Sequence, residues 1–197
     1  MSGGRSTRMG QEKGLIPLGG VPMVGHVLKT VSSVADETII SVARGMTKRY
    51  ADSLGSAFRI VEDEREGFGP LGGLSRALEV ARGEYVLVSP CDTPFIRPEV
   101  CRYVASVAVG SDAAVPVVRG HLEPLHGVYL RVPSLSAFRK ILAKGEHRPI
   151  EAYEYLRIQR VEEAHLRLLD PELDSFWNLN SPDDLRLAEK KLGMSSR

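Results

Sequence analysis

The chain has 197 residues, of which 43% are hydrophobic and 26% charged, the composition of a globular protein with a substantial core. Its formal net charge is +1, so no overall field favours nucleic acid or an anionic membrane, and any anion site must be local. No apolar run reaches transmembrane length, the N-terminus lacks the apolar core of a signal peptide, and Cys91 and Cys101 have no metal-binding spacing. We therefore expect a cytoplasmic protein.

The predicted elements alternate between strands and helices over much of the chain. The first elements are an extended pair around a Gly-Gly turn at 15–22, a helix at 23–34, a strand at 37–43, a helix at 46–54 and a strand at 58–61. A glycine-rich turn at 67–74 then leads into a helix to about residue 81, followed by a strand at 85–89 and a helix at 97–109. The rest of the chain has predicted strands at 113–118, 124–130 and 158–161, helices at 133–144 and 149–156, and a last helix from Ser181. In that last helix we expect Ser181 as the N-cap and Pro182 at the first helical position. The alternation predicts an α/β fold with a mainly parallel sheet.

The opening stretch, residues 3–13, combines glycines with the cations Arg5, Arg8 and Lys13. Small residues leave backbone N–H groups uncovered, and the cations neutralise negative charge, so such a loop suits a triphosphate. Neither Gly-x-x-x-x-Gly-Lys-Ser/Thr nor a Gly-x-Gly-x-x-Gly that follows a strand is present. Taken alone, the same composition is also that of a frayed, solvated tail.

Two aspartates follow predicted strands, at the edge where α/β sheets bind ligands. Asp92 lies between Pro90 and Pro94, whose stiff backbones hold its carboxylate in place. It is either a hard oxygen ligand for a Mg²⁺ that bridges phosphate oxygens, or a cap for the next helix or turn. Asp63 is a candidate for ribose hydroxyls or metal-bound water, or it is a solvated member of the acidic run 62–66.

Two other features each allow a binding role and a structural one. The run 69–74, with Gly72 and Gly73, lets a flat base lie against bare backbone, or it makes a tight turn and close helix packing. Asn178 and Asn180 direct two amides at a ligand, or they belong to the start signal of the last helix. The remaining candidates are histidines without metal spacing, which we expect to be surface or packing residues: His121, His126 and His147.

Taken together, these features stand in a recognisable order: the basic glycine-rich loop, Lys13, Asp63, the Gly-Pro-Leu-Gly-Gly-Leu run, Cys91-Asp92-Thr93-Pro94, and Asn178-x-Asn180-x-Pro182. Over nearly its whole length the chain resembles the molybdenum cofactor guanylyltransferase family (molybdopterin-guanine dinucleotide biosynthesis protein A), which belongs to the GT-A-like nucleotidyltransferases. The resemblance implies a Rossmann-like three-layer sandwich of the nucleotide-diphospho-sugar transferase type. It also implies one domain over 1–197, with a nucleotide-binding part at about 1–110 and an acceptor-binding part at about 111–197.

The resemblance assigns roles to individual residues. The residues expected to bind the nucleotide or the acceptor are Ser2, Gly3, Gly4, Lys13, Asp63, Gly72, Gly73, Asp92, Asn178 and Asn180. Of these, Lys13 would bind the phosphates with Arg8 as a helper, and Asp92 would hold Mg²⁺ at the α-phosphate. Asn180, with Asn178, would lie toward the pterin or the metal. Where the family often has Asn, this chain has Ser41, whose shorter hydroxyl reaches less far.

The implied reaction transfers GMP from GTP to molybdenum-bound molybdopterin and releases pyrophosphate. Its partners would be GTP, molybdopterin, and cofactor-delivery proteins or apo-molybdoenzymes, with no nucleic acid and no membrane. Two rival functions stay open. One is a related nucleotidyltransferase that uses CTP on the same pterin or GTP on a phosphorylated small acid. The other is a non-catalytic GTP-binding adaptor in cofactor delivery.

The chain departs from the family at its start. The family has an apolar strand of roughly five residues before the glycine pair, whereas here only Met1 and Ser2 precede it. Loss of a central strand would expose the edges of its neighbours and leave the phosphate loop without an anchor. The sequence hypothesis is therefore a truncated first strand, with the true start codon upstream.

Overall fold

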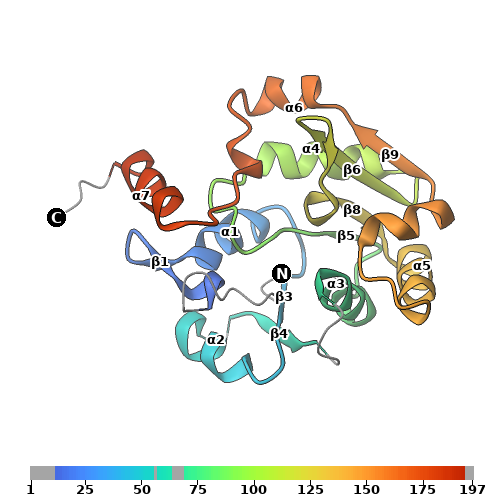
Figure 1. Ribbon diagram of the computed structural model, residues 1–197, viewed down its shortest axis with the longest axis horizontal. Coiled ribbons are helices and arrows are strands. Elements are labelled where there is room, and N and C mark those ends of the chain that lie inside the picture. The colour runs from blue at the N-terminus through green and yellow to red at the C-terminus, as the bar shows by residue number, and fades with distance from the viewer. Residues whose placement is uncertain (1–11, 56, 64–68, 194–197) are drawn as a thin grey trace.

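A computed structural model describes residues 12–55, 57–63 and 69–193 of the chain. Its strands are β1 Pro17–Leu18, β2 Val21–Pro22, β3 Ile39–Val42, β4 Arg59–Glu62, β5 Tyr85–Leu87, β6 Ala113–Val118, β7 His121–Leu122, β8 Val128–Leu130 and β9 Ile158–Val161. Its helices are α1 Met23–Val31, α2 Thr47–Leu54, α3 Gly69–Val80, α4 Pro98–Ala108, α5 Arg131–Ala143, α6 Glu163–Leu169 and α7 Pro182–Lys191. Short 3₁₀ helices are η1 Lys13–Leu15, η2 Pro124–His126, η3 Pro149–Tyr155 and η4 Asp174–Phe176. The predicted α/β architecture is confirmed (Figure 1).

The strands pair in both directions, and within the described ranges two pairings are parallel and four antiparallel, so the sheet seen there is mixed and not mainly parallel as predicted. In the first half of the chain, β3 pairs with β4 in parallel. In the second half the strand order is β5-β8-β6-β7, with antiparallel neighbours, and β9 adds to β6 in parallel. The hairpin β1–β2 turns at Gly19 and Gly20, which both have positive φ, the requirement of a tight hairpin turn.

The central strand β6 is buried at all its positions because helices cover both faces of the sheet. Ala113 and Val115 pack in one apolar cluster with residues of α3 and α5. Ala114 and Val118 pack in a second cluster with residues of α4 and α6. Successive side chains of a strand point to opposite faces, so these two clusters are the two interfaces of a three-layer sandwich (Figure 1).

The structure contains α6 and β7, which were not predicted, and three other differences change the start or the type of a predicted element. The run 69–74 is the start of α3 and not a turn before it, because Leu71, Leu74 and Leu78 follow helical spacing and are fully buried. The strand predicted at 124–130 begins only at Val128, and the residues before it form η2, which starts at Pro124. The helix predicted at 149–156 is the 3₁₀ helix η3.

His126 is a packing residue, as predicted. Its ring is 5% exposed and lies 5.0 Å from the ring of Phe176. Burial lowers the pKa of His126 to about 3, so the imidazole is neutral at physiological pH.

The helices of the described residues are all too short or too polar to span a membrane.

The N-cap of α7 is also as predicted. The backbone N–H of Asp184 donates to Ser181 Oγ at 3.1 Å, and the backbone N–H of Ser181 donates to Asp184 Oδ2 at 2.8 Å, which completes a capping box.

We expect Ser181→Ala to lower the stability of the protein by about 1 kcal/mol, because the first turn of α7 loses its side-chain acceptor. In thermal unfolding this is a fall in Tm of about 2–4 °C for a chain of this size. Ser106→Ala, at an exposed position inside α4, is the matched control and should leave Tm nearly unchanged. Equal effects of the two substitutions would contradict the role of the cap.

Candidate active site

The loop after β5 is held by contacts inside it and by a distant segment. The Thr93 hydroxyl donates to the Pro90 carbonyl at 3.3 Å, and both residues are buried. The backbone N–H of Leu179 donates to the Asp92 carbonyl at 2.9 Å. Asp92 therefore has a fixed backbone, with a side chain that is 14% exposed.

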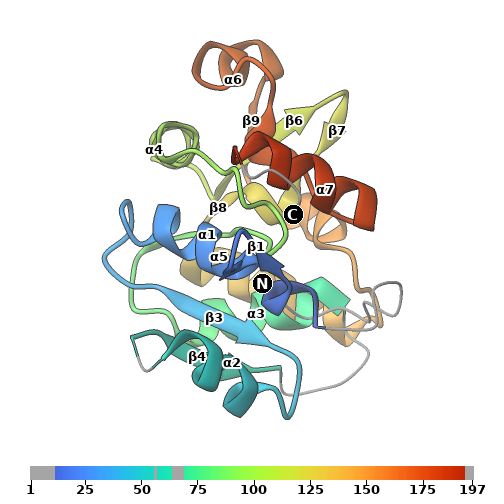
Figure 2. The same ribbon diagram turned by 90° about the vertical axis from the view of Figure 1, so that its left-hand side faces the viewer.

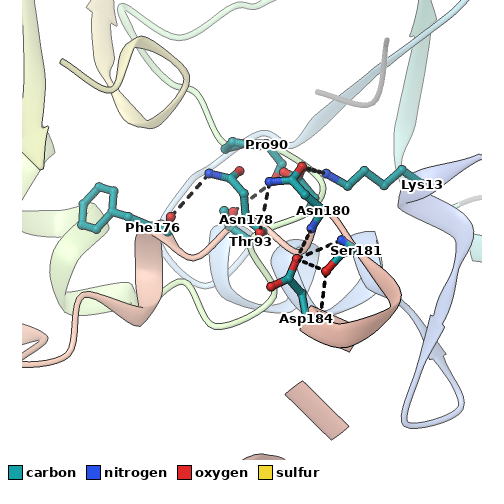
Figure 3. A network of polar contacts seen from close by, with 9 residues as sticks. Lys13, Pro90, Thr93, Phe176, Asn178, Asn180, Ser181 and Asp184 are labelled. Atoms are coloured by element: carbon teal, nitrogen blue, oxygen red, sulfur yellow. Dashed lines mark hydrogen bonds and ion pairs between the residues drawn. The ribbon is translucent and has the colours of Figure 1, made fainter. Parts of the chain in front are cut away.

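Lys13 joins two of the predicted site residues. It lies on η1, and its ammonium forms an ion pair with the Asp92 carboxylate. The same Nζ donates to Asn180 Oδ1 at 2.7 Å (Figure 3). Three segments that are far apart in the sequence thus meet at one ammonium group.

The residue before Lys13 is tied to the protein interior. Tyr50 of α2 is fully buried, and its hydroxyl donates to Glu12 Oε1 at 3.0 Å. Burial raises the pKa of Tyr50, so the phenol stays protonated and keeps donating. The sequence contains no motif that links these two side chains, and this anchor was not predicted.

Asn180 is positioned by the capping box of α7. Its backbone N–H donates to Asp184 Oδ2 at 2.9 Å, and Ser181 donates to the same oxygen. Its side-chain amide donates to the Asn178 carbonyl at 3.3 Å, while the Asn178 side chain donates to the Phe176 carbonyl at 3.4 Å (Figure 3). Asn180 therefore contacts Lys13 directly, whereas Asn178 supports the segment beside it.

Asp63 follows β4 and has a different partner. The Ser41 hydroxyl donates to its Oδ1 at 2.8 Å. Burial raises the pKa of Asp63, and the hydrogen bond from Ser41 partly opposes that rise. Asp63 thus lies past the end of β4, whereas the Lys13 cluster lies past the end of β5.

The remaining candidates are two glycines on a helix and four residues that the structure does not describe. Gly72 and Gly73 belong to the first turns of α3, where Gly73 is buried. Four predicted residues lie outside the described part of the chain: Ser2, Gly3, Gly4 and Arg8.

The described residues include no group of three or more His, Cys, Asp or Glu side chains that could hold a metal ion. However, an Asp92 carboxylate oxygen and Asn180 Oδ1 converge on one cation, the Lys13 ammonium. These are hard oxygen donors of the kind Mg²⁺ binds, and Mg²⁺ commonly takes its other ligands from water and substrate phosphates. The donor set fits a metal held jointly with a nucleotide.

Comparison with known proteins decides the family. A family model for the MobA-like NTP transferase domain matches residues 1–159. The chain belongs to the MobA-like NTP transferase family. It is 38% identical to a probable molybdenum cofactor guanylyltransferase of Pelotomaculum thermopropionicum, over 94% of this chain and 87% of the relative. It is 33% identical to a molybdenum cofactor guanylyltransferase of Desulfosudis oleivorans, over 96% and 92% of the two chains.

Solved structures agree with this family. Molybdopterin-guanine dinucleotide biosynthesis protein A of Archaeoglobus fulgidus superposes with a TM-score of 0.80 at 28% identity, over 98% of this chain and 96% of that one. The 2-C-methyl-D-erythritol 4-phosphate cytidylyltransferase of Thermus thermophilus shares the fold, with a TM-score of 0.70 at 19% identity over 93% and 94% of the chains. The resemblance seen in the sequence is confirmed, and this MobA-like transferase has the predicted nucleotidyltransferase fold.

We expect Asp63→Asn to stabilise this MobA-like transferase at neutral pH, because it removes a charge that burial disfavours while leaving an acceptor for Ser41. The pKa of Asp63 in the folded protein is raised above its ordinary value of 3.8. The protonated side chain therefore contributes its full stability below pH 3.8, and this stability is lost as pH rises through the pKa of the folded state. The gain in Tm from Asp63→Asn should therefore be present at pH 7 and disappear near about pH 3.

Thermal unfolding across this pH range measures the effect. Asp52→Asn, at an exposed position on α2, is the control and should not change Tm. The prediction would be contradicted if the parent protein were more stable than the Asp63→Asn variant at pH 7. Groups besides the Ser41 hydroxyl would then stabilise the Asp63 carboxylate.

Proposed function

We propose that this MobA-like transferase transfers GMP from GTP to the terminal phosphate of molybdenum-bound molybdopterin. An oxygen of the acceptor phosphate attacks the α-phosphorus of GTP. The bond from that phosphorus to the oxygen bridging to the β-phosphate breaks, and pyrophosphate leaves. The names of the relatives support this reaction, and the observation that carries it is the meeting of Lys13, Asp92 and Asn180 beyond the end of β5.

The site residues suit this chemistry because the acceptor is already an anion. A phosphate oxygen needs no strong base to become a nucleophile, so the buried, neutral His126 can serve packing alone. What the reaction needs is alignment and neutralisation of phosphate charge. Lys13 supplies a cation at a fixed position, and Arg8 would supply another.

Asp92 and Asn180 are the residues that would hold Mg²⁺ together with the nucleotide. When bound, this metal neutralises phosphate charge and polarises the α-phosphate. The ion pair with Lys13 holds the Asp92 carboxylate in place, and the hydrogen bond to Asp184 in the cap of α7 holds the backbone of Asn180. Asp63 would bind the nucleotide from the end of β4, and the run with Gly72 and Gly73 would lie against the base.

The chain is proposed to act as one domain, with nucleotide binding over about 1–110 and acceptor binding over about 111–197. Asn178 and Asn180, from the second part, would lie toward the pterin at the boundary between the two. The proposal places the enzyme in the cytoplasm, where it would hand its product to delivery proteins or apo-molybdoenzymes.

Pyrophosphate release with GTP and molybdopterin tests donor, acceptor and turnover together. Thermal shifts with GTP, CTP and ATP in the presence of Mg²⁺ separate the base specificities, because a ligand stabilises the folded state that binds it. A larger shift with CTP than with GTP would favour the cytidylyl alternative. GTP binding without pyrophosphate release would favour the adaptor.

Lys13→Ala and Asp92→Ala should each lower turnover by about a hundredfold or more, the scale of losing one transition-state electrostatic contact. The assay is pyrophosphate release at saturating GTP. The exposed residues Lys29 and Asp52 provide controls of the same charge, Lys29→Ala and Asp52→Ala, which should keep the parent rate. A near-normal rate in either site variant, with Tm unchanged, would remove that residue from the mechanism.

Asn180→Ala should lower turnover more than Asn178→Ala, because only Asn180 contacts Lys13 through its side chain. We expect a loss of about tenfold or more for Asn180→Ala, which corresponds to about 1.4 kcal/mol of transition-state stabilisation. The measurement is kcat/KM for GTP in both variants. Equal losses would mean that the two amides act as one unit on the acceptor.

A further inference from the structure

A buried carboxylate lies on the stretch of chain that leads to Asn178 and Asn180. The side chain of Asp170, the residue that follows α6, is fully buried. The backbone N–H of Ser175 donates to its Oδ2 at 2.7 Å. Its other oxygen, Oδ1, accepts no hydrogen bond from the described residues, but Arg97 Nε lies 3.2 Å from it. A charge buried in this way needs a charged partner, and Arg97 is that partner.

Arg97 joins two parts of the chain that both lead to the candidate site. It is the N-cap of α4, and the loop that carries Asp92 runs directly into it. Its backbone N–H donates to Ser175 Oγ at 3.1 Å, and its Nη1 donates to the Leu169 carbonyl at 3.3 Å. The end of the Asp92 loop is therefore bound to the stretch around Asp170 through backbone and side chain together.

An aromatic pair strengthens the same junction. The rings of Phe95 and Trp177 stack, with their centroids 5.5 Å apart and their planes 12° from parallel. The ammonium of Lys191, on α7, lies 5.7 Å from the centroid of the Phe95 ring and forms an ion pair with Asp174. The junction thus combines a buried ion pair with an aromatic stack, and α7 packs against it.

We propose that Arg97 and Asp170 are positioning residues for the proposed GMP transfer. They hold the stretch before Asn180 against the loop that carries Asp92. The two segments meet a second time closer to the site, where the backbone N–H of Leu179 donates to the Asp92 carbonyl at 2.9 Å. Two points of attachment prevent the late segment from sliding along the loop. They therefore fix the position of the Asn180 side chain.

The effect of this pair on turnover is indirect. The contacts of Arg97 and Asp170 are with the stretch that precedes Asn180, so they act through the position of that residue. Displacing a reacting group by about 1 Å can lower a rate by about a hundredfold, so a pair away from the phosphates can still matter. The kinetic part of this inference rests on the proposed function, whereas the junction itself does not.

Tryptophan fluorescence tests the junction in the absence of any substrate. Trp177 is the only tryptophan of the chain, so its emission reports on this segment alone. Asp170→Asn keeps an acceptor for the Ser175 N–H but removes the charge that binds Arg97. Quenching of the emission by acrylamide should become about twofold faster or more in this variant. Asp52→Asn, at an exposed position on α2, is the control and should leave quenching unchanged.

Hydrogen exchange follows the second point of attachment in the same variant. The amide of Leu179, which donates to the Asp92 carbonyl, should exchange about tenfold faster or more than in the parent. The amide of Val88, which donates to the Gly127 carbonyl, is the internal reference and should change little.

Pyrophosphate release tests the positioning role. Asp170→Asn should lower kcat by about tenfold, because Asn180 is no longer held in place. In a protein that already carries Asn180→Ala, the same substitution should lower kcat by less than about twofold, since it acts through a side chain that is gone. A merely structural role would instead multiply the two losses.

A double variant separates positioning from folding. Arg97→Gln alone leaves the Asp170 carboxylate buried and unpaired, which destabilises the fold. Arg97→Gln combined with Asp170→Asn removes both charges, so it should unfold at a higher temperature than Arg97→Gln. It should nevertheless show the faster quenching of Trp177 and the faster exchange of Leu179. Arg102→Gln, at an exposed position on α4, is the matched control.

Two results would overturn the proposal. One is a folded double variant in which quenching and exchange are those of the parent, because the pair would then hold nothing in place. The other is a combination of Asp170→Asn and Asn180→Ala in which the losses of kcat multiply. Quenching and exchange need no GTP, so a parent protein without turnover would refute the proposed function while the junction is still decided.

Discussion

The site depends on a single ammonium group that is shared by three distant parts of the chain. Lys13 comes from a 3₁₀ turn near the start, Asp92 from the loop after β5, and Asn180 from the approach to the last helix. Both charged side chains are largely buried, at 17% and 14% exposure, so their attraction is screened less than that of a surface pair. Each of the three segments has its own anchor: Tyr50 for the first, Leu179 for the second and the α7 cap for the third.

The sandwich explains why these segments meet. Loops that follow the strands of an α/β sheet gather at one edge. Asp63 comes directly after β4, and Asp92 lies in the loop that follows β5. In the part of the chain that the structure describes, β4 and β5 belong to two different sheets. Each aspartate has its own contacts: Lys13 and the Leu179 N–H bind Asp92, whereas the Ser41 hydroxyl donates to Asp63.

Much of the fold and part of the site could be predicted from the sequence because the patterns that indicate them are local. Strand-end aspartates, the proline-flanked Asp92 and the Ser181 start signal each follow from a few neighbouring residues, and the structure bears out their positions. The start of α3 was misplaced because glycines at 69, 72 and 73 suggested a turn, whereas three buried leucines stabilise a helix. The pairs Tyr50–Glu12 and Ser41–Asp63 join residues far apart in sequence, and no spacing rule encodes them. The glycine loop and Arg8 remain predictions.

The place of Asn180 also bears on how the domain is delimited. The family model ends at residue 159, while one of the three groups around the ammonium lies 21 residues further on, past α6 and η4. The backbone of Leu179, which holds the Asp92 carbonyl, lies in the same late segment. A fragment cut at the family boundary would be interrupted inside β9, Ile158–Val161, and would lack both of these contacts. The segment beyond residue 159 therefore completes the surroundings of the Lys13 ammonium, through the Asn180 side chain and the Leu179 backbone.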